Sequence, residues 1–123
     1  MKSVCLKKNN FGKALLLDYP HPAKMSNNDI ALQHTTYNIS HDDLSILNGN
    51  VEISRNIPSY KNHNILGLSG CGIVKKVGSS IASIKVGERM VYPFAPVGAF
   101  CEIRVLNLNY CIALPEYITD KTA

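Results

Sequence analysis

The sequence predicts a mainly β fold: a small, partly open antiparallel barrel with one short helix. Two observations lead to this fold class. Segments in which apolar and polar side chains alternate with a period of two recur between turn residues, as in half-buried strands. In addition, Gly67, Gly70 and Gly72 open the predicted strand 73–78, at positions where a backbone must bend sharply or approach another backbone closely. In an all-β domain such positions are barrel corners.

The N-terminal region predicts a hairpin followed by a longer strand. Residues 1–8 alternate weakly, residues 14–19 form a short apolar run, and a polar connection joins the two. Pro20 and Pro22 then force an extended path. The next predicted strand covers residues 29–37. One of its faces carries Ile30, Leu32, His34 and Thr36, and the other carries the residues between them.

One short helix is predicted over residues 41–48. Ser40 and Asp43 form the pattern S-x-x-D, in which the serine hydroxyl accepts from a first-turn amide and the acid complements the helix N-terminus. Asn48 and Gly49 supply a C-terminal stop.

A polar, asparagine-rich stretch without a clear period covers residues 49–64. So long a loop in a compact domain is usually functional or mobile. Because few apolar side chains anchor it, we expect it to open well below the global free energy of unfolding, with faster hydrogen exchange than strand 73–78.

The second half of the chain supplies the remaining strands. A turn at 86–89 leads into a strand at 90–94, and a strand at 110–114 ends before Pro115. Residues 99–105 alternate between two faces. One face carries Cys101, Ile103 and Val105. The other face carries Phe100, Glu102 and Arg104.

The last residues read as the start of a helix. Thr119 and Asp120 resemble an N-cap, and only three residues follow them, so we expect a truncated C-terminal helix. The total is about seven strands and one full helix.

Composition and charge exclude several classes of protein. A chain of 123 residues has room for one core, and no apolar run approaches the roughly 20 residues of a membrane span. The net charge is +4, but the basic residues are scattered rather than gathered on one face, which argues against nucleic acid as a partner. The four cysteines have no C-x-x-C spacing, and the first residues lack a secretory signal. We expect free thiols and a cytoplasmic location; a disulfide between Cys101 and Cys111 stays open as the alternative.

Three blocks of sequence resemble one superfamily. The run LGLSGCGIVKKVGSSIASIKVGERMVY is similar to P-G-x-E/D-x-x-G-x-V-x-x-V-G-x-x-V-x-x-x-K-x-G-D-R-V of the medium-chain dehydrogenase/reductase superfamily. Residues 1–22 resemble its opening strands, and residues 98–120 resemble its G-x-x-A-E-Y segment. The nearest branch is the zinc-independent quinone oxidoreductases. The resemblance implies that residues 1–123 form a GroES-like substrate-side domain and that the chain carries no NAD(P)-binding Rossmann domain.

The resemblance also predicts that this chain binds no metal. Zinc-dependent members place a cysteine before the short helix and a G-H-E sequence later, together with four clustered cysteines. Here the corresponding positions read Ser40 and Gly67-Leu68-Ser69, and the histidines are spread through the sequence at His21, His34, His41 and His63.

Cofactor and substrate residues follow from the same resemblance. The glycines at 67, 70 and 72 do not have the spacing of a phosphate-binding G-x-G-x-x-G, nor a helix behind them. The family's positions near the nicotinamide of NADPH correspond to Ser40 and Ser45, and its substrate-side positions correspond to Ser40 and Ser69. Helix capping explains Ser40 equally well.

No residue of this chain is expected to be catalytic, because in the family the nicotinamide itself delivers the hydride. Ser40-His41-Asp42 is no triad, since neighbours on one helix turn point in different directions.

The sequence is therefore consistent with two alternative functions. The first is the substrate-side domain of an NADPH-dependent quinone oxidoreductase, acting on a quinone or enone and inactive as this isolated chain. The alternative is a free-standing GroES-like barrel that serves as a non-enzymatic interaction module. In either case we expect a homo-oligomer or another association through the face that a cofactor domain would cover.

Overall fold

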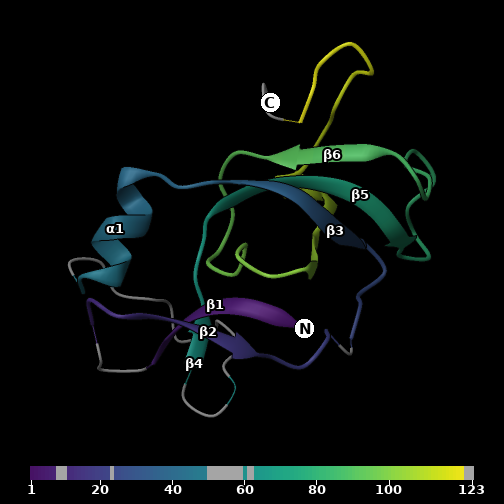
Figure 1. The fold of residues 1–123 in the computed structure, drawn as a ribbon. Coiled ribbons are helices and arrows are strands. Elements are labelled where there is room, and N and C mark those ends of the chain that lie inside the picture. The colour runs from purple at the N-terminus through teal and green to yellow at the C-terminus, as the bar shows by residue number, and fades with distance from the viewer. Residues whose placement is uncertain (8–10, 23, 50–59, 61–62, 121–123) are drawn as a thin grey trace.

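The computed structural model describes residues 1–7, 11–22, 24–49, 60 and 63–120. Within these residues the chain forms two antiparallel sheets and one short α-helix (Figure 1). The smaller sheet has the order β2-β1-β4 and the larger sheet the order β7-β3-β5-β6-β8. The strands are β1 (Lys2–Lys7), β2 (Ala14–Asp18), β3 (Asp29–Asn38), β4 (His63–Ile65), β5 (Ser69–Val77), β6 (Arg89–Tyr92), β7 (Ile103–Asn107) and β8 (Ile112–Ala113). The predicted mainly β, partly open barrel with one short helix is confirmed.

The smaller sheet contains the predicted hairpin and one strand that the sequence did not predict. β1 pairs with β2 from Lys2 opposite Asp18 to Leu6 opposite Ala14. On its other side β1 pairs with β4, where Cys5 lies opposite Ile65. The predicted loop 49–64 is therefore wrong at residues 63–64, because a three-residue strand is too short to show a period and is defined only by its partner. Residues 50–59 and 61–62 of that loop lie outside the described residues, so its expected mobility stays a prediction.

β3 is the central strand of the larger sheet and pairs with β5 on one side and β7 on the other. Ile30 and Leu32 from its first half are fully buried in the main hydrophobic core. The pairing with β5 shifts register between Ala31 and Leu32 and again between His34 and Thr36. Such bulges bend a strand and increase its twist, which lets a small sheet curl toward a barrel.

The predicted helix is present as α1 (His41–Leu47), and its cap has the predicted form. The Asp43 carboxylate accepts the Ser40 N–H at 2.8 Å, which is one half of a capping box, and it also accepts the Ser40 hydroxyl at 3.1 Å. The Asn48 N–H donates to the Leu44 carbonyl at 3.0 Å, and Gly49 follows with a φ of 79°. A positive φ favours glycine at the residue after a helix.

Several strand boundaries in the second half differ from the prediction. β5 begins at Ser69 rather than at residue 73, since the glycines that mark its bend also take part in the ladder. β6 ends at Tyr92, because Pro93 has no N–H to continue the pairing. β7 covers Ile103–Asn107 rather than 99–105.

The predicted strand 110–114 is also different. Leu108–Tyr110 form a 3-10 turn, because the Asn107 side chain accepts the Asn109 N–H at 2.9 Å, and only Ile112–Ala113 remain as β8. The predicted C-terminal helix begins where the described residues end, so it remains a prediction.

No helix among the described residues is long and apolar enough to cross a membrane.

Candidate functional site

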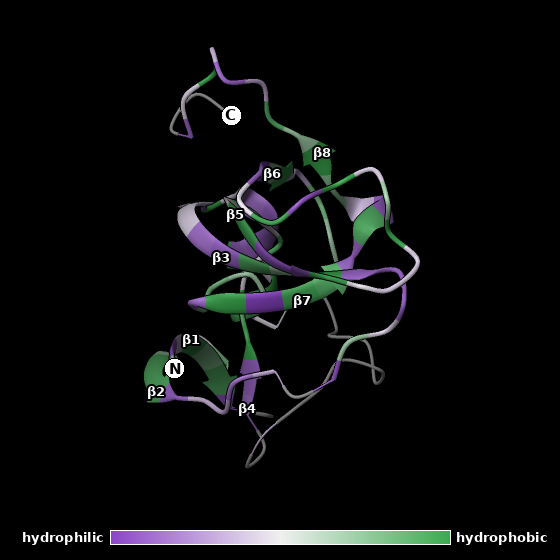
Figure 2. Cartoon of the chain, turned by 90° about the vertical axis from the view of Figure 1, so that its right-hand side faces the viewer, coloured by the Kyte–Doolittle hydropathy of each residue, from purple (hydrophilic) through white to green (hydrophobic). Residues whose placement is uncertain are grey.

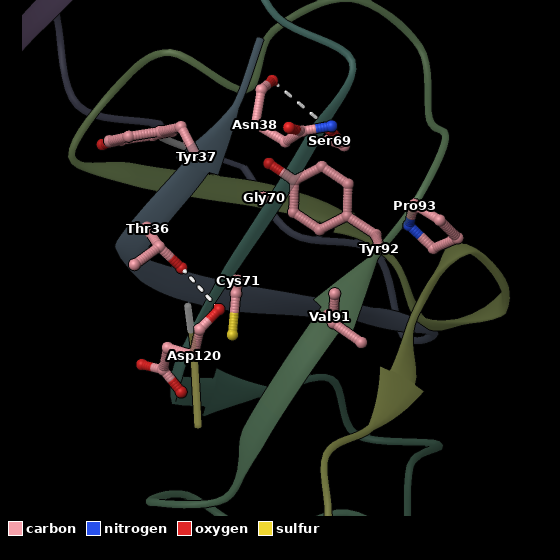
Figure 3. Close-up of a pocket in the computed structure, with 10 residues that line it drawn as sticks. All are labelled: Thr36, Tyr37, Asn38, Ser69, Gly70, Cys71, Val91, Tyr92, Pro93 and Asp120. Atoms are coloured by element: carbon pink, nitrogen blue, oxygen red, sulfur yellow. Dashed lines mark hydrogen bonds between the residues drawn. The ribbon is translucent and has the colours of Figure 1, made fainter. Parts of the chain in front are cut away.

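A cavity of about 400 Å³ opens at the edge where three neighbouring strands begin or end (Figure 3). Because β3, β5 and β6 are antiparallel neighbours, the end of β3, the start of β5 and the end of β6 meet at one edge of the sheet. The C-terminal tail closes one side of this edge with Asp120. We call this the strand-end cavity. It is lined by Thr36, Tyr37, Asn38, Ser69, Gly70, Cys71, Val91, Tyr92, Pro93 and Asp120.

Asp120 is fixed to the sheet by side chains from two strands. The Thr35 hydroxyl donates to its carboxylate at 2.5 Å, and Arg89 Nη1 donates to it at 2.6 Å. Arg89 also donates to the Pro115 carbonyl at 2.8 Å, so a single guanidinium ties two points of the tail to β6. The Thr35 hydrogen bond and then the Arg89 cation lower the pKa of Asp120. The carboxylate is therefore charged at neutral pH at the rim of the cavity.

A buried hydrogen-bonded pair lies beneath the cavity. The Tyr92 hydroxyl is 2.5 Å from His34 Nε2, and His34 Nδ1 is 2.9 Å from the Cys101 carbonyl oxygen. Because a carbonyl oxygen only accepts, Nδ1 carries the proton and Nε2 accepts from the Tyr92 O–H. A side chain at Gly70 would come within 2.9 Å of the His34 ring, which explains the glycine above this pair.

Burial keeps this pair neutral. It lowers the pKa of His34 to about 4 and raises the pKa of Tyr92. Burial, followed by the Asp120 charge, also raises the pKa of the Cys71 thiol. At neutral pH the floor of the cavity thus offers neither an imidazolium nor a thiolate, and its groups act by shape and hydrogen bonding.

The three serines that the sequence singled out lie in different surroundings. Ser69 is buried in the cavity wall, where its hydroxyl lies 3.5 Å from the Asn38 carbonyl oxygen. Ser40 is two residues beyond Asn38 and is occupied in capping α1. Ser45 lies on α1, and its hydroxyl donates to the His41 carbonyl at 3.3 Å. The strand-end cavity thus includes Ser69 but neither Ser40 nor Ser45, and the binding roles of all three remain predictions.

The sequence did not single out most of the cavity wall. Asn38, Tyr92 and Asp120 are far apart in the chain and converge through strand pairing and the Arg89 anchor. One signal was available: three predicted strands with antiparallel neighbours must bring alternate ends to the same edge.

In the described part of the chain, no three histidine, cysteine, aspartate or glutamate side chains gather in a way that could hold a metal ion. The cysteines there are all free thiols: Cys5, Cys71, Cys101 and Cys111.

We expect the purified protein to retain no stoichiometric zinc. Ser40 and Leu68 occupy the superfamily's metal positions, and both ring nitrogens of His34 are already hydrogen-bonded. Elemental analysis after dialysis against a weak chelator checks this, with a zinc-dependent alcohol dehydrogenase carried through the same dialysis as the control. One equivalent of zinc retained by this chain would contradict the prediction.

Comparison with known proteins places the chain in a family. Residues 26–116 match the sequence profile of the alcohol dehydrogenase GroES-like domain. The chain belongs to this family. The resemblance to the medium-chain dehydrogenase/reductase superfamily is thereby confirmed, and the domain corresponds to the superfamily's N-terminal catalytic domain.

Two relatives show how much of a larger protein the family domain occupies. Quinone oxidoreductase 1 of Escherichia coli is 30% identical over 102 residues, which are 83% of this chain and 29% of that protein. Squalestatin hexaketide synthase of a Phoma species is 27% identical over 99 residues, 80% of this chain and 4% of that protein. The chain therefore spans less than a third of either relative.

Solved structures share the fold at lower identity. The E. coli quinone oxidoreductase complexed with NADPH superposes with a TM-score of 0.83 at 24% identity, over 98% of this chain and 35% of that one. The alcohol dehydrogenase TADH from Thermus sp. ATN1 gives a TM-score of 0.81 at 18% identity, over 98% of this chain and 42% of that one.

Proposed function

We propose that this domain is the substrate-side wall of an NADPH-dependent, zinc-independent quinone oxidoreductase that reduces a quinone or enone. The observation that carries the proposal is the strand-end cavity in a domain whose relatives include quinone oxidoreductases. The nicotinamide, when bound, supplies a hydride to the acceptor ring, and a proton from water completes the hydroquinone.

The cavity wall suits a flat ring that carries hydrogen-bond acceptors. Val91 and Pro93 supply apolar surface, and Asn38 and Ser69 supply polar groups. A volume of about 400 Å³ lies within the range of small-molecule sites. Because the His34–Tyr92 pair is neutral and buried, the chain's own contribution is to position the ring and to exclude water from one face.

Binding of the NADPH dinucleotide requires a kind of structure that the described residues do not contain. Phosphate binding of the Rossmann type uses a glycine-rich turn between a parallel strand and a helix N-terminus. Both sheets in the described residues are antiparallel, and their one α-helix has seven residues. We infer that a separate nucleotide-binding domain holds the cofactor across the strand-end cavity.

Mixing this chain with a separately expressed cofactor domain of a quinone oxidoreductase tests the proposal. Alone, the chain should neither bind NADPH nor reduce a quinone, because a hydride donor must be held within near-attack distance of its acceptor. The mixture should oxidise NADPH slowly when quinone is present, measured by the loss of nicotinamide absorbance. Micromolar NADPH binding by the chain alone, measured by calorimetry, would contradict this assignment.

Association without turnover has its own follow-up. In that case Ser40→Asn together with Ser45→Tyr should restore activity, because the quinone oxidoreductases that the chain resembles have an asparagine and a tyrosine at these two predicted cofactor positions. Ser80→Asn, in an exposed turn, is the matched control and should have no effect. If the double variant stays inactive in a complex that forms normally, the cofactor roles of Ser40 and Ser45 are wrong.

An interaction module is the second candidate, favoured by apolar side chains beside the cavity. Ile39 and Phe94 directly follow the lining residues Asn38 and Pro93, and they are 73% and 65% exposed. Tyr117, in the tail, is 85% exposed. Exposed apolar groups of this kind mark surfaces that another domain or chain covers. A homodimer in sedimentation experiments that Phe94→Ser dissociates would support association through this edge.

A further inference from the structure

β2 forms the outer edge of the smaller sheet and is open on one side. The sheet has the order β2-β1-β4, so β2 pairs only with β1 among the strands that the structure describes. Figure 2 shows the β1–β2 hairpin at one side of the molecule, with hydrophobic residues along it. An edge strand presents a row of backbone N–H and C=O groups that another strand can pair with. The open side of β2 is therefore a candidate interaction surface.

The hydrogen-bonding pattern shows which residues of β2 carry the free backbone groups. The Met1 ammonium donates to the Tyr19 carbonyl, and the Tyr19 N–H donates to the Met1 carbonyl, each at 2.7 Å. Because bonded and non-bonded pairs alternate along an antiparallel ladder, Leu17 and Leu15 also bond to β1. The other residues of the strand turn their N–H and C=O groups away from β1: Ala14, Leu16 and Asp18.

The same three residues of β2 also have exposed side chains, whereas Leu15 and Leu17 are half-buried. Leu16, at the centre of the strand, is apolar and yet 70% exposed. Natural sheet edges are commonly protected by lysine, proline, a bulge or a very short strand. β2 has five residues without lysine or proline, and its pairing with β1 runs without a register shift. This edge therefore lacks the usual protection against another strand.

The other open edges of the two sheets are less suited to pairing. β4 has three residues and β8 has two, which leaves little backbone for a ladder. β7 has five residues, but its Ile103 and Val105 are half-buried and line a cavity together with Tyr19 and Pro20. Among the described strands, β2 is therefore the edge that combines free backbone groups with exposed side chains.

The outward residues of β2 are arranged symmetrically about Leu16. A two-fold axis at this residue places a second β2 antiparallel to the first, with Leu16 opposite the partner's Leu16 and Ala14 opposite the partner's Asp18. Every outward N–H and C=O of the strand then has a partner, and the two leucines form an apolar cross-strand pair. The two Asp18 carboxylates lie about 14 Å apart along the strands, so like charges do not meet.

We propose that two copies of this chain associate through β2 and form a continuous sheet with the strand order β4-β1-β2-β2-β1-β4. No residue of β2 lines the strand-end cavity, so this surface is independent of the proposed function. The pairing of one short strand makes a small interface, and we expect a dissociation constant on the order of 100 μM.

Sedimentation equilibrium of the full chain, from about 10 μM to about 1 mM, measures this association. Leu16→Lys should weaken the dimer at least about tenfold, because the two introduced ammonium groups would face each other across the axis. Val86→Lys is the matched control and should have no effect, since Val86 is 61% exposed in the turn between β5 and β6. A chain that stays monomeric at millimolar concentration, or a dimer that Leu16→Lys leaves intact, would overturn the proposal.

Cross-linking tests the register of the pair. In Leu16→Cys the two substituted residues would have Cα atoms about 5.5 Å apart, so a short bismaleimide should join two copies. In Asp18→Cys, the matched control, they would lie about 14 Å apart along the strands and should not be joined. The wild type gives the background from its own cysteines, of which Cys111 is half-buried and the others are buried. Equal cross-linking of the two variants would rule out pairing about Leu16.

Discussion

Replacing Gly72 with alanine should destabilise the fold by about 3 kcal/mol or more, a large part of a small domain's total stability. The added carbon would lie 2.2 Å from the Gln33 carbonyl oxygen and 2.8 Å from its carbon. These are backbone atoms of β3, and β3 is held by β5 on one side and by β7 on the other. The strand cannot move away without breaking a ladder, so relief requires the loss of pairing beside the strand-end cavity.

Gly87→Ala is the matched control for this prediction. Gly87 has a φ of 96°, which disfavours alanine, but nothing lies within 4 Å of the added carbon. The backbone cost alone is about 1–2 kcal/mol. Urea denaturation followed by circular dichroism gives both free energies of unfolding. If Gly72→Ala proves no more destabilising than Gly87→Ala, the close approach of β5 and β3 at this point is wrong.

Gly72 also shows what the sequence could and could not supply. The spacing of three glycines predicted a close backbone approach, and the structure has one at Gly72. The backbone that Gly72 approaches, at Gln33, could not be predicted, because the pairing of β3 with β5 contains two register shifts that no local pattern records. For the same reason β4 was missed, since its three residues are a strand only through β1.

β7 shows a second limit. Alternation placed Arg104 on the same face as Glu102, but it could not say which face points inward. In the structure Leu106, two residues after Arg104 on the same face of β7, packs into the core, and Arg104 is buried beside it. Glu102 precedes β7 and is exposed. Periodicity defines which residues share a face, whereas burial is decided by the sheet that packs against it.

The candidate site also contains residues that the sequence could predict and residues that it could not. The family resemblance assigns positions one by one and points to Ser69, which lies in the cavity wall; its binding role stays a prediction. The local sequence indicates only a helix cap at Asp120, yet Thr35 and Arg89 hold its carboxylate against the sheet. A contact between residues 85 positions apart follows from the tertiary fold and leaves no local pattern.

Acidification from pH 6.5 to 4 should lower the free energy of unfolding by up to about 3 kcal/mol, through His34 alone. Burial holds the pKa of this histidine at about 4, below its ordinary value of 6.5. In this window the unfolded chain binds a proton that the folded chain does not, so stability falls as the pH falls. Protonation would also place a second cation near Arg104 and force Nε2 to donate toward the Tyr92 hydroxyl.

His34→Gln should flatten this pH dependence relative to the wild type. Glutamine can still donate to the Cys101 carbonyl and accept from Tyr92, so the variant removes the titration more than the packing. The lowered pKa values of Asp18 and Asp120 act mainly below the window, because an unfolded carboxyl with the ordinary pKa of 3.8 takes up most of its proton below pH 4. Urea denaturation at several pH values between 4 and 6.5 measures the slopes. Parallel slopes for wild type and His34→Gln would show that His34 is not held neutral by the fold.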